Sequence, residues 1–251
     1  MPGRAKKHLR PMMSFSLRLH YQKRKEMCLP LCMRWLLLGM GLLTLYAQSS
    51  KPTWYAPKLG VNWGQYRTRD VEDITSRSYW GGGFYGGLAV QQGLDPKGWW
   101  AVQGELGVTQ RRSTDRNLLT DWRYNLWSVD LAVLGVWRWV RKFEAFFVEA
   151  GPSSSLLLYG KYWERNNLTQ EMESRKVQFG RGTGRDVRRG EIALNAGLGA
   201  GYLVGPGYLT FGLRFWHGLN NLGAGGLFQR WHNYGALMTL AYWYDDTLRE
   251  E

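Results

Sequence analysis

The sequence predicts an all-β protein, an eight-stranded antiparallel up-and-down transmembrane β-barrel with short turns at one end and long loops at the other. Three observations lead to this fold class. Eight segments alternate between bulky apolar residues and small or polar ones, which is the period of a β-strand. The connections between these segments alternate between short and long. No run of 18 or more apolar residues is present, so an ordinary transmembrane helix is not expected.

The first 47 residues are predicted to be a signal peptide, which leaves residues 48–251 for the barrel domain. A basic stretch precedes the apolar run Leu36–Tyr46, and the small residue Ala47 follows at a suitable cleavage position. This run is too short to span a bilayer as a helix. Met13, Met27 and Met33 are alternative starts, since the leader is longer than usual.

Removing the leader changes the charge and the cysteine content. It holds nine Lys and Arg and one acid, so the mature formal charge is (33 − 9) − (20 − 1) = +5 rather than +13. Both cysteines, Cys28 and Cys32, also leave with it. We therefore expect no nucleic-acid partner, no disulfide framework and no cysteine nucleophile.

The predicted strands show one bulky face and one small face. In order, they are Lys58–Tyr66, Tyr79–Gln91, Trp99–Arg111, Trp122–Val140, Phe143–Tyr159, Glu191–Val204, Tyr208–Trp216 and His232–Tyr244. In the sixth, Leu194, Leu198 and Tyr202 alternate with glycine and polar residues. Lipid would solvate the bulky face, and small residues suit the narrow lumen of an eight-stranded barrel.

The connections predict the direction of the barrel in the membrane. They are, in order, Arg67–Ser78, GLDPKG, Arg112–Asp121, RK, Gly160–Gly190, GPG and His217–Trp231. Outer-membrane barrels have short periplasmic turns and long extracellular loops. We expect an integral protein of the bacterial outer membrane with both termini in the periplasm.

Aromatic residues gather at strand ends, where a headgroup-level girdle would lie. The predicted girdle is Trp99, Trp100, Trp137, Trp139, Tyr242 and Tyr244. The alternative is that these are core aromatics of a soluble sandwich, but the small inner face offers little to fill such a core.

Alternation also directs charged side chains into the lumen. Glu105, Asp130, Glu149 and Arg214 are predicted near mid-height, with Arg138 lower and Glu191 higher. Isolated charges in a narrow lumen are costly, so they should pair. We expect Arg214 to bridge toward one or more of the three mid-height acids and to close the lumen. A proton relay is the alternative for the same residues.

Catalysis and metal binding find little support in the sequence. The mature chain has two histidines, His217 and His232, which bracket the last long connection and are interpreted as interfacial side chains rather than a metal pair. No serine lies in a recognisable nucleophile motif. We therefore expect neither enzymatic activity nor a cofactor or metal.

The longest connection, Gly160–Gly190, contains eight Lys and Arg and four acids. It is interpreted as a mobile, solvated loop. The alternative is a basic outer surface that contacts lipopolysaccharide phosphates or a partner protein.

Several motifs resemble the PorT-like outer-membrane β-barrel family. They are KLGVNW, QGELGVTQR, FFVEAGP, LNAGLGAGY and LRFWHGLNNL, spread over Pro57–Tyr244. The resemblance implies a non-enzymatic barrel and, for some members, a role in type IX protein secretion. The fourth predicted strand lacks a proline that members often carry, and the chain continues beyond its last aromatic residue. The pattern that the barrel-assembly machinery is expected to read is supplied by Asn233, Gly235, Met238 and Leu240.

Two functions from different classes remain open. One is a closed structural or interaction barrel that contacts outer-membrane lipid and lipopolysaccharide and is accessory to a secretion apparatus. The other is a narrow pore for ions or small solutes. The lumen charges of both signs and the small strand number favour the first.

Overall fold

The structure is a computed structural model that describes residues 53–68, 77–95, 97–141, 144–180, 186–223 and 231–245. The predicted signal peptide, residues 1–47, lies outside the described residues. The strands are β1 (Thr53–Thr68), β2 (Arg77–Gly93), β3 (Trp100–Arg116), β4 (Thr120–Arg141), β5 (Glu144–Asn166), β6 (Met172–Lys176), β7 (Gly190–Val204), β8 (Gly207–Gly218) and β9 (Trp231–Asp245).

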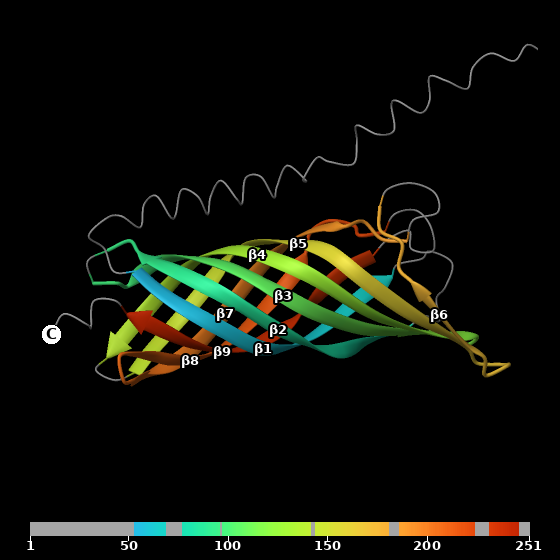
Figure 1. Ribbon diagram of the computed structural model, residues 1–251, viewed down its shortest axis with the longest axis horizontal. Coiled ribbons are helices and arrows are strands. Elements are labelled where there is room, and N and C mark those ends of the chain that lie inside the picture. The colour runs from blue at the N-terminus through green and yellow to red at the C-terminus, as the bar shows by residue number, and fades with distance from the viewer. Residues whose placement is uncertain are drawn as a thin grey trace, which may run out of the picture.

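Eight of these strands form a closed antiparallel ring. The sheet order is β4-β3-β2-β1-β9-β8-β7-β5-β6, and an additional β4–β5 pairing closes it. Consecutive strands pair around the ring, except that β5 pairs with β7 because β6 lies outside the ring. The first and last strands, β1 and β9, also pair. The predicted fold class is confirmed. The ring is viewed from the side in Figure 1, where its strands run obliquely.

The strand β6 was not predicted. It is a short hairpin strand that pairs only with the far end of β5, over Lys161–Arg165, and so lies outside the ring. The sequence assigned this segment to a loop because a five-residue strand with four polar positions carries no apolar alternation. In Figure 1, β6 projects beyond the right-hand end of the ring.

The two faces of the ring differ as the alternation predicts. Leu59, Phe84 and Leu88 are 62–68% exposed on the outer face, whereas Ala56 and Ala89 are 2% exposed on the inner face. Among the described residues, no helix has the length and apolar character needed to cross a membrane. A bulky exposed face on a closed ring of strands is stable in hydrocarbon, because every ring strand has a hydrogen-bonded neighbour on both sides.

Two aromatic rows mark the limits of the apolar band. Trp100, Trp137 and Trp139 are 40–56% exposed near the short turns, and Trp127 and Tyr159 are 37% and 46% exposed toward the opposite end. On β4 the outward residues Trp127 and Trp137 are ten positions apart. Ten residues span about 33 Å along a strand, or about 25 Å along the membrane normal at a tilt of ~40°. That height matches the apolar band of outer-membrane barrels.

The strands at the long-loop end run well past this band. The hairpin β3–β4 is closed by residues 117–119 alone, and β5 continues to Asn166 before it turns into β6. The backbone N–H of Asn167 donates to the carbonyl of Leu119 at 2.7 Å and joins the two hairpin tips. Most of the predicted connection Arg112–Asp121 and part of Gly160–Gly190 are therefore strand residues, and they form a projecting four-stranded sheet, β3-β4-β5-β6.

The interpretation of Gly160–Gly190 as a solvated loop holds for its many exposed residues but not for its strands and its buried side chains. Val177 and Val187 are 7% and 0% exposed and belong to an apolar cluster at the long-loop end of the lumen. The other members of this cluster are Tyr66, Tyr124, Leu126, Leu157, Tyr162, Leu222 and Trp231. Two isolated valines within a basic segment gave no period from which sequence could predict burial.

Apolar clusters lie toward both ends of the lumen. A second apolar cluster, Trp54, Ala56, Ala89, Ala241 and Trp243, lies at the short-turn end. Small residues permit the close packing between these ends: a side chain at Gly235 would collide with the ring of Trp216 and with the backbone of Trp63. The charged residues described next occupy the middle of the lumen.

A charged layer across the lumen as the candidate functional site

Four charged side chains from four strands meet at mid-height of the lumen. They are Lys58 on β1, Glu105 on β3, Glu149 on β5 and Arg214 on β8, and all are at most 5% exposed. Each lies on the inner face of its strand, because its neighbours in sequence, such as Leu59, Leu106 and Phe215, are exposed on the outer face. We call these four residues the charged layer.

Arg214 lies at the centre of the charged layer. Its Nη1 and Nη2 donate to Glu105 Oε2 and Oε1 at 2.6 and 2.8 Å, a bidentate arrangement. Its Nε donates to Glu149 Oε1 at 2.6 Å. Glu105 Oε1 also accepts from Lys58 Nζ at 2.5 Å. The layer therefore spans the lumen, and its two cations and two anions cancel in formal charge.

Gln103 connects the two carboxylates of the layer. Its Nε2 lies 2.5 Å from Glu105 Oε1 and 3.4 Å from Glu149 Oε2. A neutral amide adds hydrogen bonds without disturbing the charge balance, which fits a site in which each carboxylate oxygen needs a donor.

A second charged cluster lies closer to the long-loop end. Arg111 on β3 pairs with Glu191 at 2.5 Å and with Asp130 at 2.9 Å. Hydroxyls of Thr109 and Ser128 donate to Asp130 at 2.5 and 2.8 Å. Asn233 Nδ2 donates to Glu191 at 2.9 Å. This cluster has one cation and two anions, so its formal charge is 1 − 2 = −1.

The predicted lumen residues separate into three places. Arg214 contacts Glu105 and Glu149, as expected, but Asp130 and Glu191 pair with Arg111 instead. Arg138 stacks on Trp54, with its guanidinium carbon 3.9 Å from the ring centroid, near the short-turn end. Arg214 therefore bridges two of the three mid-height acids, whereas the third, Asp130, pairs with Arg111 together with Glu191.

Sequence reasoning missed Lys58 and Arg111. For Arg111, the signal that could have identified it is the alternation along the strand. Arg111 is six residues from Glu105, an even number, so both side chains lie on the same face of β3. Arg111 is the last residue of its predicted strand, and no role in the lumen was predicted for it. Lys58 is the first residue of its predicted strand, and it was likewise not counted among the lumen charges.

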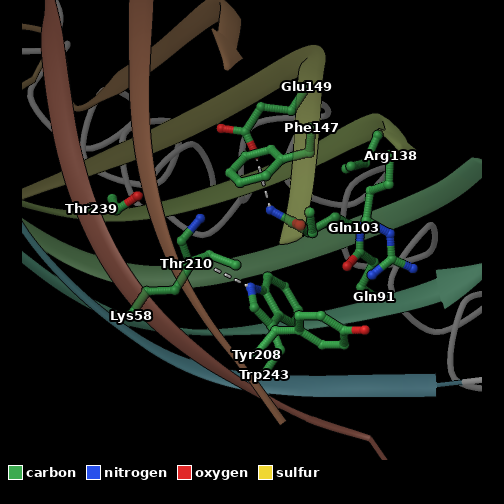
Figure 2. A pocket seen from close by; sticks show the side chains of 12 residues that line it. Lys58, Gln91, Gln103, Arg138, Phe147, Glu149, Tyr208, Thr210, Thr239 and Trp243 are labelled. Carbon is green, nitrogen blue, oxygen red and sulfur yellow. Dashed lines mark hydrogen bonds between the residues drawn. The ribbon is translucent and has the colours of Figure 1, made fainter. Parts of the chain in front are cut away.

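Two small cavities of about 40 Å³ each lie in the lumen. One is lined by Lys58, Gln103 and Glu149 with residues of the short-turn end, and is shown in Figure 2. The other is lined by Glu105, Arg214 and Arg111. The charged layer therefore lies between the two, and each has room for about three water molecules.

The remaining predicted residues lie on identifiable faces. The predicted girdle is at the short-turn end, where Trp99, Trp100, Trp137, Trp139 and Tyr244 are 40–56% exposed and Tyr242 is half-buried. On β9, Asn233 and Gly235 face the lumen while Met238 and Leu240 face outward. His217 is exposed and His232 half-buried on the outer face, and the described residues contain no group of three or more potential metal ligands.

A closed ring of eight antiparallel strands, apolar outside and charged inside, defines the class of integral β-barrel membrane proteins. Residues 46–223 match the family model described as outer membrane protein beta-barrel domain, and the chain belongs to this family. It is therefore a β-barrel protein of the bacterial outer membrane. A comparison with curated proteins gave no match.

Solved structures with a similar course of the chain are bacterial outer-membrane barrels. Ail of Yersinia pestis, solved with the heparin analogue sucrose octasulfate, is 13% identical, with a TM-score of 0.38 over 76% of this chain and 99% of Ail. OprG of Pseudomonas aeruginosa is 9% identical, with a TM-score of 0.43 over 79% and 98%. The protease OmpT of Escherichia coli is 9% identical, with a TM-score of 0.43 over 79% and 99%. These likenesses concern the fold alone.

Proposed function

We propose that the protein is a non-enzymatic outer-membrane barrel with a closed lumen, and that it serves a structural or interaction role. The observation that carries the proposal is the bridge from Lys58 through Glu105 and Arg214 to Glu149, which joins four strands across the lumen at 2.5–2.6 Å. Apolar clusters toward both ends of the lumen support the proposal.

A conductance measurement tests the closed lumen. Purified wild-type protein, inserted into planar lipid bilayers, is expected to give no steady channels at neutral pH. Insertion is verified beforehand by the faster gel mobility of the unboiled, folded band. Large open channels from protein with that mobility would overturn the proposal.

The alternative is a narrow pore, which the two cavities on either side of the charged layer favour. Residues of the charged layer line both cavities: Lys58 and Glu149 line one, and Glu105 and Arg214 line the other. A pore would conduct small ions in discrete steps, and its current would change on Lys58→Met, which removes one of the two cations from the layer. A closed barrel gives the same absence of current for both proteins.

We also propose that the long-loop end faces the cell exterior and that both termini are periplasmic. Short turns on the periplasmic side are the rule for outer-membrane barrels. Leu118 lies at a hairpin tip of the long-loop end and is 78% exposed, and the sequence has no cysteine after Cys32. Leu118→Cys should therefore react with a membrane-impermeant maleimide on intact cells.

The partners proposed for this barrel are the assembly machinery and a secretion apparatus. The pattern Asn233, Gly235, Met238 and Leu240 on β9 supports recognition by the assembly machinery, and the PorT-like sequence motifs support an accessory role in type IX secretion. Deletion of the gene should then retain type IX cargo in the periplasm. Normal export of all cargo would restrict the protein to a structural role.

A further inference from the structure

The projecting sheet β3-β4-β5-β6 has an outer face that is continuous with the lipid-facing face of the barrel. The register shows which side chains lie on this face, since residues paired across neighbouring strands point to the same side of the sheet. One row is Arg112, Asn125, Lys161 and Lys176, the next is Thr114, Arg123, Trp163 and Ser174, and the third is Arg116, Asp121, Arg165 and Met172. We call these three rows the basic face.

Charges are segregated between the two faces of the projecting sheet. The basic face has six cations and one acid, Asp121, which is 3.5 Å from Arg116. The opposite face, which includes the buried Tyr162, has the acids Asp115, Glu164 and Glu173 and a single cation, Arg175. Such segregation is not what a merely soluble surface requires, because mixed charges serve solubility equally well.

The cations of the basic face repel one another. Lys161 lies directly opposite Lys176, and Arg123 has no acid among its cross-strand partners Thr114 and Trp163. Like charges directly opposite each other destabilise a sheet. A multivalent anion bound over the face would remove this repulsion.

The height of the basic face identifies the anion. The rows begin two residues above Trp127 and Tyr159, the aromatic row that marks the edge of the apolar band. At ~3.3 Å per residue and a tilt of ~40°, the three rows lie about 5, 10 and 15 Å above that edge. Aromatic belts lie at the headgroup level. The phosphates of lipid headgroups, and any phosphorylated sugars attached above them, occupy the same heights.

We propose that the basic face is a binding surface for a phosphate-bearing glycolipid of the leaflet that surrounds the long-loop end. This inference rests on the membrane-embedded barrel and the outward orientation proposed above. It places the site on two hairpins, since Arg112, Arg116 and Arg123 come from β3–β4 and Lys161, Arg165 and Lys176 from β5–β6. The basic segment Gly160–Gly190 alone does not form it.

The test is a lipid titration followed by native mass spectrometry. Full-length mature protein in a zwitterionic detergent is titrated with diphosphorylated lipid A and, separately, with the same lipid after its phosphates are removed. The phosphorylated lipid should bind more tightly by about a hundred-fold or more, and added salt should reduce that difference.

A matched pair of variants locates the site. The triple substitution Arg112→Gln, Arg123→Gln and Lys161→Gln should weaken binding of diphosphorylated lipid A by about a hundred-fold, because each cation near a phosphorylated surface contributes roughly five-fold. The control is Arg175→Gln, Arg188→Gln and Arg189→Gln, which removes the same charge from three exposed positions outside the basic face. It should change binding less than about three-fold.

Three results would overturn the proposal: equal binding of both lipids by the wild type, equal losses for the two triple variants, or no effect of salt. The wild-type titration decides the matter even if a variant fails to fold. Failure here is distinct from failure of the proposed function, because Leu118→Cys labelling and conductance are measured without added lipid A.

Discussion

The charged layer in the lumen and the basic face of the projecting sheet use the same residue types in opposite ways. In the layer, every charge is buried and lies within 2.6 Å of an opposite charge. On the basic face, six cations share one acid and most are exposed. In the charged layer, a buried charge without a partner would be costly. On the basic face, exposed charges remain available to bind a ligand.

This contrast separates stability from binding within one chain. A substitution in the layer leaves another charge buried and unpaired, so the free energy of unfolding should change. A substitution on the basic face leaves a solvated neighbour, so lipid binding should change while stability does not. The following variants test that separation, from the largest expected effect to the smallest.

Arg214→Ala is expected to be the most destabilising change. It leaves Glu105 and Glu149 buried with Lys58 as the remaining partner in the layer, and removal of one member of a buried ion pair costs about 3–5 kcal/mol. Urea unfolding of protein refolded into lipid vesicles, followed by gel mobility, measures the loss. Conductance should stay negligible, because the apolar clusters remain.

The control for Arg214→Ala is Arg123→Ala, the same substitution on the basic face. It should change the free energy of unfolding by less than about 0.5 kcal/mol. If the two variants lost the same free energy of unfolding, the charged layer would contribute no more to stability than the basic face.

Asp115→Asn should stabilise the protein, and by more at higher pH. Asp115 lies on the inner face of the projecting sheet, beyond the membrane-spanning band, and burial raises the pKa of its carboxyl from 3.8 to about 6. The folded state then holds a proton that the unfolded state releases, so wild-type stability falls as pH rises from about 4 to about 6 and is level above that.

The size of this effect follows from the shift. Two pKa units correspond to at most about 3 kcal/mol, which Asp115→Asn should recover at pH 7.5 but not at pH 4. Unfolding midpoints in urea at the two pH values measure it. A variant that is equally stabilised at both would show that the carboxyl does not titrate between them.

Glu191→Gln should have a small effect, although Glu191 is 1% exposed. Arg111 keeps Asp130 as its ion-pair partner, and the amide oxygen of glutamine still accepts hydrogen bonds. The substitution also removes the excess negative charge of this cluster, so stability should stay within about 1 kcal/mol of the wild type. A loss comparable with that of Arg214→Ala in the same urea assay would show that this cluster depends on its net charge.

Most of the ring was predictable from the sequence, because period-two alternation depends only on the strand and on which side meets lipid. The bulky row Leu59, Val61 and Trp63 shows this on β1. The pairing of Arg214 with Glu105 could be anticipated from parity and height. The pairing of Arg111 with Glu191 was not predicted, because Arg111 is the last residue of its predicted strand and was not counted among the lumen charges.

The projecting sheet was harder to predict for a physical reason. Its outer face meets water and headgroups rather than hydrocarbon, so the strands lose the apolar half of their pattern beyond Trp127 and Tyr159. What replaces it is an alternation of charge sign between the two faces, which becomes visible only after the register is known. Glu164 next to Arg165 and Asp115 next to Arg116 show it. Without knowledge of the strand pairing, such segments are predicted to be loops.

Arg116→Ala should have the smallest effect on stability. The side chain of Arg116 is 50% exposed, and its ion pair with Asp121 is 3.5 Å long. Exposed pairs of this kind contribute about 0–1 kcal/mol, so the free energy of unfolding should change by less than about 0.5 kcal/mol in the urea assay. Affinity for diphosphorylated lipid A should nevertheless fall by roughly five-fold, since one cation of the basic face is lost. A variant that loses stability but keeps its affinity would assign Arg116 to the hairpin itself and remove it from the basic face.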